Sequence, residues 1–474
     1  MKKLITTALT FDDVLLVPKR SSVKSRKDVS VSTKLTRNIS MKIPIISANM
    51  DTVTEAKMAK RMAVEGGIGI IHRFLDINEQ VAEVLKVKRS ESMVVENPYT
   101  FSPNKTVADA KEFMKEFDVG GLLIVNEKEK LIGILSRRDV LFADNTSLVS
   151  DVMTRNPVTI KKQISLEEAK KLLFKHRIEK LPIVDDNGNI RGLITSEDIR
   201  KVQDHPLALK DKKGRLMVGA AIGVKEGFLK RAAALIKAGA DVLVVDIAHG
   251  HSDLAINTVK SLKKHFPKTD VIAGNVATAE GTYDLIKAGA DAVKVGVGPG
   301  SICITRIVAG SGVPQLSAVM ACAKVAKKYG VPIIADGGVK TSGDLIKALA
   351  AGASTVMCGN ILAGTKEAPG LIILRNGRRY KVSRGMASFG ASLGRKTREG
   401  NMDDGLDIVP EGVEAMVPYK GDAKAVLHQM IGGLRSGISY CGAKSIPQMQ
   451  KNAEFVKITS GGLRESKPHD VELI

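Results

Sequence analysis

The feature that most constrains the fold is a short unit that recurs along the second half of the chain. In each copy a helical stretch ends at Ala-Gly-Ala and an apolar run follows, as in KAGADVLVVD, KAGADAVKVG and AAGASTVMCG. Apolar runs without polar alternation are typical of parallel strands that are buried on both faces. Further runs lie at Ile43–Ser47, Ile68–His72, Val271–Asn275 and Val331–Asp336. Because about eight such runs alternate with helical segments, the sequence predicts a parallel β/α architecture.

The residues at the ends of these runs indicate which β/α architecture to expect. In a (β/α)8 TIM barrel, the active site lies at the carboxyl ends of the strands. A doubly wound sheet is the alternative, but no dinucleotide-binding glycine fingerprint follows the first strand. We therefore expect a TIM barrel. Its candidate site residues at the ends of the runs are Ser47, Asp246, Asn275, Gly296, Asp336 and Gly359.

The rhythm is interrupted by an internal repeat. NPYT at 97–100 recurs as NPVT at 156–159, and GILS at 133–136 recurs as GLIT at 192–195. Every matched pair is 59 residues apart. A fixed period indicates two copies of one supersecondary unit, here a strand, a helix, two strands with a turn, and a second helix.

The repeat defines the expected domain organisation. We expect a discontinuous barrel domain at 1–92 and 207–474. The inserted module at 93–206 would contain repeats at about 93–150 and 151–206. A chain of 474 residues is long enough for two or three domains.

Composition excludes several classes of protein. No apolar run reaches the length of a membrane span, and the N-terminus turns acidic too early for a signal peptide, so we expect a cytoplasmic protein with no membrane partner. The net charge is +21, but the basic residues are spread along the chain and aromatic residues make up only 4%. This favours a solvated lysine-rich surface over a specific nucleic-acid site. The four cysteines are scattered and form no metal-ligand pair.

The segment GVGPGSICITRIVAGSG at 296–312 contains the candidate nucleophile. Glycines let the backbone turn its amides and carbonyls toward a ligand. A thiol on such a loop, here Cys303, attacks carbon well once it is ionised. The alternative is that Cys303 is a small buried hydrophobe beside a tight turn. A later irregular stretch, 383–412, is typical of disorder or of a functional lid.

The repeat resembles a tandem pair of CBS domains, on the stretches GILSRRD and GLITSED. The resemblance implies a cleft that binds adenine or guanine nucleotides and regulates the attached domain. Asp139 and Asp198 would then contact ribose. A structural pair without a ligand is the alternative.

The whole chain resembles the family of IMP dehydrogenases and GMP reductases. The motifs that carry the resemblance are ISANMDTVTE, VVDIAHGHS, GNVAT, GVGPGSICITR, IADGGV, RGMAS, VPEGV, GGLRSG and LRESKPHDV, in this order. The resemblance implies that Cys303 attacks C2 of IMP, that hydride passes from C2 to NAD, and that water hydrolyses the thioimidate to XMP. Thr305 would assist proton transfer. In the reductase branch, the cysteine displaces ammonia from GMP, and hydride from NADPH then gives IMP.

The resemblance also implies binding roles and an assembly. The substrate would contact Ser47, Ser301, Asp336, Gly337, Gly338, Gly359, Asn360, Gly385, Met386 and Glu411. The cofactor would contact Asp246, Asn275, Gly296 and Gly298. Carbonyls of Gly298, Gly300 and Cys303 would bind a potassium ion, completed by a neighbouring subunit of a homotetramer or octamer through Glu465, Ser466 and Lys467.

Three of these acids have a purely structural alternative. Asp246 and Asp336 could cap the helices that follow them. Glu411 could be an exposed loop acid. The order of the motifs favours the functional interpretation.

The chain departs from the dehydrogenase pattern in its flap, which reads LGRKTREGN. Dehydrogenases carry an Arg-Tyr pair there, whose arginine activates water, whereas this chain has Thr397-Arg398. We expect Arg398, or Arg395, to take the base role. Further departures are Ser383 for tyrosine, Asn360 for serine and Ala387 for glycine.

Three functions follow from these motifs and departures. We expect the dehydrogenase, because TRIVAGSGVPQL, LRESKPHDV and the CBS pair favour it. An enzyme without the Arg-Tyr pair fits the reductase. A nucleotide sensor without turnover is the third possibility, and the intact Cys303 and Thr305 argue against it.

Overall fold

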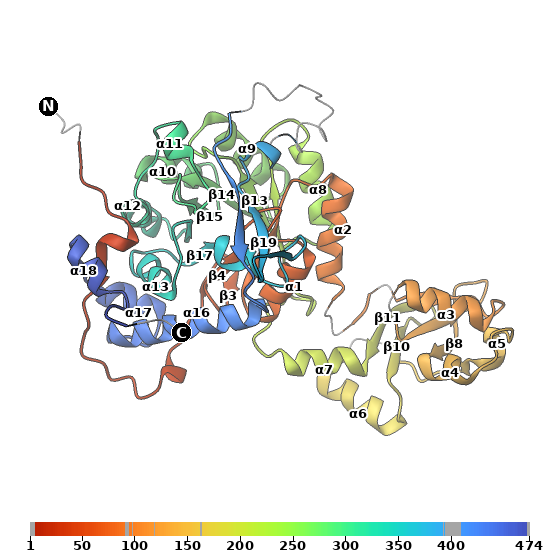
Figure 1. Ribbon diagram of the computed structural model, residues 1–474. Coiled ribbons are helices and arrows are strands. Elements are labelled where there is room, and N and C mark those ends of the chain that lie inside the picture. The colour runs from red at the N-terminus through yellow and green to blue at the C-terminus, as the bar shows by residue number, and fades with distance from the viewer. Residues whose placement is uncertain are drawn as a thin grey trace. The chain divides into compact units, whose positions relative to one another are not determined.

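The chain forms two compact units in a computed structural model (Figure 1). The structure describes residues 5–90, 94–96, 98–117, 119–161, 164–391, 393 and 409–471. The first unit consists of Met1–Lys88, Leu207–Asp211 and Leu216–Ile474, and the second of Arg89–Pro206 and Lys212–Arg215.

The first unit contains a closed barrel of parallel strands, which confirms the predicted TIM barrel and excludes the doubly wound sheet. The strand order is β12-β13-β14-β15-β16-β17-β4-β5. Their bounds are β4 Ile45–Ser47, β5 Ile68–Ile71, β12 Gly219–Ile222, β13 Val242–Asp246, β14 Asp270–Val276, β15 Ala292–Val295, β16 Ile333–Asp336 and β17 Thr355–Cys358. The first two strands precede the insertion, and the other six follow it.

One helix after each strand covers the outside of the barrel (Figure 1). These helices are α1 Ala56–Val64, α2 Ile77–Lys88, α8 Phe228–Ala238, α9 Asp253–His265, α10 Ala279–Lys287, α12 Gln315–Lys328, α13 Ser342–Ala350 and α16 Ala423–Tyr440. The recurrent Ala-Gly-Ala ends three of them. Its glycines, Gly239, Gly289 and Gly352, adopt left-handed φ values of 98°, 106° and 111°, a conformation that suits glycine at a helix end.

The barrel strands are buried on both faces because alternate residues belong to two different cores. Ile46, Val244, Ile272 and Ile334 lie in the core inside the barrel. Their neighbours, such as Leu243, Val245, Val271 and Ile333, lie in the core between the strands and the helices. This arrangement explains why the strands read as continuous apolar runs.

Other elements of the first unit complete it. The short hairpin of β2 Thr33–Lys34 and β3 Ser40–Met41 contributes Leu35 and Met41 to the inner core. β18 Ile373–Arg375, β19 Arg378–Arg384 and β20 Glu414–Pro418 form an antiparallel sheet. The other elements among the described residues of this unit are η1 Phe11–Asp13, β1 Val14–Leu16, η2 Arg26–Asp28, α11 Thr305–Val308, α14 Asn360–Ala363, α17 Ile446–Asn452, β21 Phe455–Lys457 and α18 Ser460–Glu465.

The second unit repeats its elements at the 59-residue spacing seen in the sequence. The first copy has α3 Val107–Glu116, β7 Gly121–Val125, β8 Leu131–Ser136 and α4 Arg137–Phe142. The second copy has α6 Leu166–His176, β10 Lys180–Val184, β11 Ile190–Thr195 and α7 Ser196–Asp204. Each copy has its own apolar core. Shorter elements beside the first copy are β6 Thr100–Phe101, α5 Val149–Val152 and β9 Thr154–Arg155.

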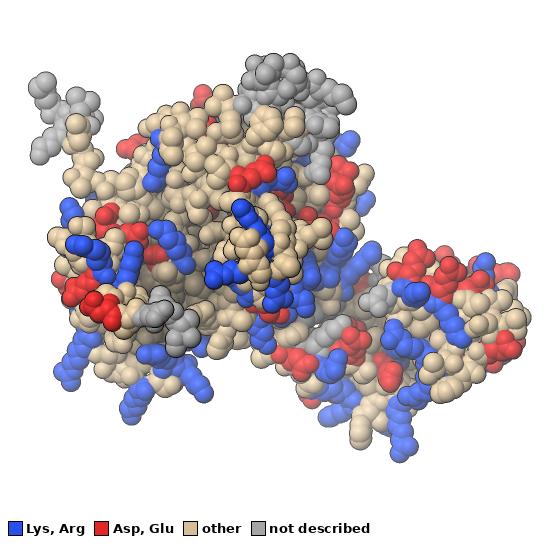
Figure 2. Space-filling model, in the orientation of Figure 1, with Lys and Arg blue, Asp and Glu red and all other residues tan. Residues whose placement is uncertain are grey.

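The basic residues are distributed over the surface and do not form one patch on the face shown (Figure 2). On the face shown in Figure 2, Lys and Arg are spread over both units with acidic residues among them. Among the described residues, none of the helices is both long and apolar enough to cross a membrane.

Candidate active site

The predicted strand-end residues gather at one end of the barrel, which we call the carboxyl face. Asp246 and Asp336 are the last residues of β13 and β16, and Gly296 and Gly359 directly follow β15 and β17. The strands are parallel and closed into one barrel. Their loops therefore surround a common space, as in the active sites of other TIM barrels.

The candidate nucleophile belongs to a chain of three polar groups. Cys303 Sγ lies 3.2 Å from Thr305 Oγ1, which donates to Glu411 Oε2 at 2.7 Å. A threonine hydroxyl has one proton, and here the carboxylate accepts it, so the thiol is the donor to Thr305. All three side chains are partly exposed. The arrangement can carry a proton away from the sulfur, and it shows that Glu411 is not a free loop acid.

Backbone hydrogen bonds join the segment around Glu411 to the loop that carries Cys303, and join the segment around Gly385 to that of Glu411. Ile304 N donates to Glu411 O at 2.8 Å, and Glu411 N donates to Ala387 O at 2.9 Å. Gly385 approaches closely, because a Cβ on it would lie 3.1 Å from Ile302 O. The predicted base-binding residues Gly385, Met386 and Glu411 are therefore held beside the thiol.

A second network joins three strand ends. Asn275 Nδ2 donates to Asp336 Oδ2 at 2.9 Å and to Gly296 O at 2.8 Å. Lys294 Nζ donates to the same Asp336 oxygen at 2.6 Å and also to Asn275 Oδ1. The structure thus brings a predicted substrate residue, Asp336, into contact with a predicted cofactor residue, Asn275.

The loops after β15 and β16 approach each other through glycines. A Cβ on Gly296 would lie 2.0 Å from Asp336 O. A Cβ on Gly337 would lie 2.8 Å from Pro299 Cγ and 3.1 Å from Gly300 N. Gly337 and Gly338 have φ values of 91° and 79°, in the left-handed region that favours glycine.

Neither strand-end aspartate caps the following helix, so the structural alternative is wrong for both. Ser252 caps α9, whereas Asp246 accepts a hydrogen bond from Arg73 Nε at 2.9 Å. Thr341 caps α13 in a capping box with Asp344. Asp246 and Asp336 remain available at the carboxyl face, each with a cationic partner.

The remaining predicted substrate residues lie in different environments. Ser47 is fully buried, and its hydroxyl lies 2.8 Å from Thr54 Oγ1, which itself donates to Ala48 O at 2.6 Å, so Ser47 helps to hold the loop after β4. Ser301 is exposed on the cysteine loop. Gly359 precedes α14 as its N-cap, and Asn360 is the first residue of the helix. The ammonium of Lys420 donates to the carbonyls of Asn360 and Ile361. Burial lowers the pKa of Lys420.

The predicted potassium ligands divide into two groups. Gly298 and Gly300 lie in the loop before Cys303, and the Arg306 side chain packs against Gly298. Backbone carbonyls of such a loop suit a hard cation. Glu465, Ser466 and Lys467 are exposed at the end of α18, and their predicted role in another subunit stays a prediction. In the described part of the chain, no group of three or more His, Cys, Asp or Glu side chains could hold a metal ion.

The two flap candidates, Arg395 and Arg398, lie outside the described residues. Their predicted base role therefore stays a prediction. Ser383, another departure noted in the sequence, is buried, and its Oγ has no hydrogen-bond partner among the described residues.

The other three cysteines differ from Cys303 by their burial. Burial raises the pKa of Cys358 to about 12 and that of Cys322 to about 11, and it also raises the pKa of Cys441. All four are free thiols. The three buried thiols are held neutral, and neutral thiols are poor nucleophiles.

In the second unit, the acids at the matched positions have structural roles. Asp139 accepts from Ser136 N and Oγ at 2.7 Å, and Asp198 accepts from Thr195 Oγ1 at 2.5 Å. These are helix-capping contacts at the starts of α4 and α7. They explain why the acids recur and leave the predicted ribose contact as a proposal.

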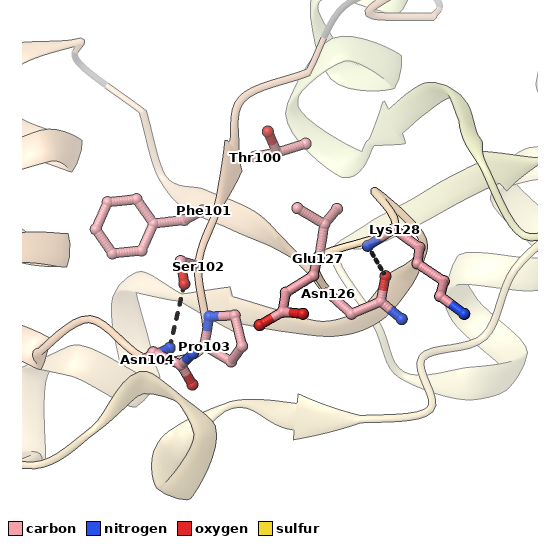
Figure 3. A pocket seen from close by; sticks show the side chains of 9 residues that line it. Thr100, Phe101, Ser102, Pro103, Asn104, Asn126, Glu127 and Lys128 are labelled. Atoms are coloured by element: carbon pink, nitrogen blue, oxygen red, sulfur yellow. Dashed lines mark hydrogen bonds between the residues drawn. The ribbon is translucent and has the colours of Figure 1, made fainter.

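Two hollows mark the surface of the second unit. One of 670 Å³ is lined by residues 100–104 and 125–128, and Figure 3 shows it between β6 and the turn after β7. The other, of 700 Å³, is lined by Lys170, Lys175 and Arg177 among others. The lining of the second hollow also includes the acid Glu179, and Lys170 is paired with Glu167 at 2.8 Å.

Sequence reasoning missed the partners of the predicted residues. Lys294 contacts the Asp336 side chain, and Gln315 contacts the Asp336 carbonyl. Arg73 contacts Asp246. The signal that could have found Lys294 is its place in the run ADAVKVG, where a lysine interrupts an apolar strand. Charged residues are rarely buried without a partner.

Comparisons with known proteins agree with this geometry. The family model "IMP dehydrogenase / GMP reductase domain" matches residues 8–469. Inosine-5'-monophosphate dehydrogenase of Nitrosopumilus maritimus (strain SCM1) is 61% identical over 98% of this chain and 99% of its own. GMP reductase of Leishmania donovani is 55% identical over 98% of this chain and 97% of its own. Since this reductase matches almost its full length, the inserted module does not separate the two activities.

A solved structure matches over the whole fold. A cysteine-to-alanine variant of GMP reductase from Trypanosoma brucei, in complex with guanosine 5'-monophosphate, superposes with a TM-score of 0.95 and 51% identity. The match covers 99% of each chain.

Proposed function

Because the chain belongs to the IMP dehydrogenase / GMP reductase family, we propose that it oxidises IMP to XMP. The observation that carries this proposal is the chain of contacts from Cys303 through Thr305 to Glu411. The 61% identity to the Nitrosopumilus dehydrogenase over nearly both chains favours this direction.

The thiol of Cys303 begins the reaction. Its sulfur forms a bond to C2 of IMP as its proton moves toward Thr305 and Glu411. NAD supplies the hydride acceptor, so C2 is oxidised and a thioimidate to Cys303 remains. Water then adds to C2 and the sulfur leaves, which gives XMP and restores the thiol.

The residues of the carboxyl face divide between the two ligands. Asp336, Gly337 and Gly338 support the ribose and phosphate of IMP, and Gly385 and Met386 face the base. Asp246 and Asn275 hold the nicotinamide ribose, because a carboxylate and a carboxamide suit its hydroxyls. Carbonyls of the cysteine loop hold a potassium ion, which fixes the loop when bound.

The second unit is proposed to be a tandem CBS module that binds adenine or guanine nucleotides. The recurrence of all four main elements at one spacing supports this, as does the hollow near α6 and α7, where Lys175 and Arg177 could meet a phosphate. A homotetramer would bring Glu465, Ser466 and Lys467 to a neighbouring potassium site.

GMP reduction is the second candidate. The flap lacks the Arg-Tyr pair, and reduction of GMP with NADPH requires no activated water. The two reductases, at 55% and 51% identity, favour it as well. A nucleotide sensor without turnover is less well supported, because the contacts of the thiol are intact.

Absorbance at 340 nm separates these candidates. Purified protein in potassium buffer is mixed with IMP and NAD in one cuvette and with GMP and NADPH in another. A rise in the first is expected. A fall in the second alone would establish the reductase instead. Cys303→Ala should abolish either signal, whereas Cys441→Ala, which changes a buried thiol outside the carboxyl face, should preserve it.

A further inference from the structure

One buried side chain joins the two proposed binding regions. Lys294 contacts both Asp336 and Asn275, and Asn275 Nδ2 donates to the Asp336 oxygen that also accepts from Lys294. We propose that Lys294 is a positioning residue that couples binding of the mononucleotide at Asp336 to binding of the dinucleotide at Asn275. The inference rests on the proposed function, which assigns these two ligands.

The barrel places Lys294 where it can act on both residues. It follows Ala292 by two positions on β15, and Asp336 follows Ile334 by two positions on β16. Ala292 and Ile334 both lie in the core inside the barrel, so Lys294 and Asp336 point to the same interior. Both occupy the carboxyl ends of neighbouring strands.

The burial of Lys294 leaves its ammonium few alternatives. The residue is 3% exposed, whereas the Asp336 side chain is 22% exposed. A buried cation must keep its partners, since water is not available to replace them. Among Lys294, Asn275 and Asp336, the lysine is therefore the residue that cannot move, and the more exposed Asp336 carboxylate is the group that a ligand can reach.

The shared oxygen provides the coupling. Two donors occupy Asp336 Oδ2, which leaves Oδ1 to accept from a ribose hydroxyl. A ligand that fixes the Asp336 carboxylate also fixes the donor geometry of Asn275. The second ligand then meets a site that is already ordered, and by linkage each ligand must strengthen the other by the same factor.

The test measures this factor by calorimetry in the full-length Cys303→Ala protein, where no chemistry interferes. IMP affinity is measured with and without saturating NAD, and NAD affinity with and without IMP. We expect each ligand to tighten the other about fivefold or more. Lys294→Met should reduce the factor to about one, and Lys294→Arg should restore part of it.

Two further variants separate coupling from stability. Lys88→Met removes another buried lysine, paired with Asp211 and Asp241 at the opposite end of the barrel, and should lower the melting temperature while leaving the factor unchanged. Asn275→Ala keeps the Lys294–Asp336 ion pair, so it should fold even if Lys294→Met does not. It also removes a proposed NAD contact, so NAD affinity alone should fall, and IMP affinity should no longer change when NAD is raised to saturate the variant.

The outcomes are distinguishable. If both ligands bind the Cys303→Ala protein independently, or if Lys294→Met and Asn275→Ala retain the parent factor, the inference is wrong. If neither IMP with NAD nor GMP with NADPH binds, the proposed function itself fails.

Discussion

At the scale of single residues, the hydroxyl of Thr305 lies where the proposed reaction moves the proton of Cys303. It contacts Cys303 on one side and Glu411 on the other. Thr305→Val keeps the branched shape but removes the hydroxyl. We expect kcat to fall about 100-fold or more, the usual effect of losing one proton-transfer group. The measurement is the initial rate at saturating nucleotide and cofactor.

The matched control is Thr305→Ser, which restores the hydroxyl with a smaller side chain. It should recover most of the activity. Both variants should bind the mononucleotide as the parent does. Equal rates for the valine and serine variants would show that the contacts of the hydroxyl do not matter for turnover.

The buried thiols predict a pH dependence of stability. The pKa values of Cys358 and Cys322 rise from 9.0 in the unfolded chain to about 12 and about 11 in the fold. Above about pH 9 the unfolded chain loses these protons first, so stability falls as the pH rises toward 11 or 12. The double variant Cys322→Ala/Cys358→Ala should lose less melting temperature between pH 9 and pH 11 than the parent does. Parallel curves for the two proteins would contradict this assignment.

The sequence predicted where the candidate site residues lie better than it predicted their contacts. Cys303 and Asp336 could be singled out because a loop or strand end identifies them locally. The contact of Lys294 with Asn275 and Asp336 joins three strands, and the separation of those strands depends on how the barrel closes. The pairing of Arg73 with Asp246 likewise spans 173 residues. A local sequence pattern does not indicate which distant residues will come into contact.

At the scale of elements, two loops of the carboxyl face depend on close backbone contact. Gly337 lies against Pro299 and Gly300, which precede Cys303. Gly337→Ala adds strain of about 1–2 kcal/mol from the left-handed backbone, and its Cβ collides with the neighbouring loop as well. We expect a loss of stability above that strain, measured by urea denaturation, and weaker mononucleotide binding.

Gly330→Ala is the control, because it adds the strain of a left-handed backbone without a collision. Gly330 has φ of 63°, and a Cβ there would meet nothing within 4 Å. It should cost about 1–2 kcal/mol of stability and leave nucleotide affinity unchanged. Equal losses of stability and equal nucleotide affinities in the two variants would show that the close approach of the loops does not affect binding.

Elements were more predictable than contacts, for a physical reason. Strands buried on both faces favour apolar residues along their length, and a glycine is favoured where a helix ends in a left-handed conformation. Both preferences are local and appear in AGADVLVVD and its relatives. The capping roles of Asp139 and Asp198 were missed because a capping acid and a ligand-binding acid share one sequence pattern.

At the scale of the whole molecule, the barrel and the inserted module are stabilised separately. All eight barrel strands and both of their cores belong to the first unit. The two remaining cores belong to the second unit. Because the insertion lies between α2 and β12, its removal leaves every strand of the barrel in place.

Excision of 89–206, with a flexible Gly-Ser linker joining Lys88 to Leu207, should therefore give a folded barrel that retains turnover with IMP and NAD. The full chain should respond to ATP or GTP through its module, whereas the excised protein should not respond. Rates and melting temperatures with and without each nucleotide provide the measurement. A nucleotide response that survives excision would place the regulatory site on the barrel. Loss of folding would show that the barrel core depends on the insertion, against the separation of cores seen here.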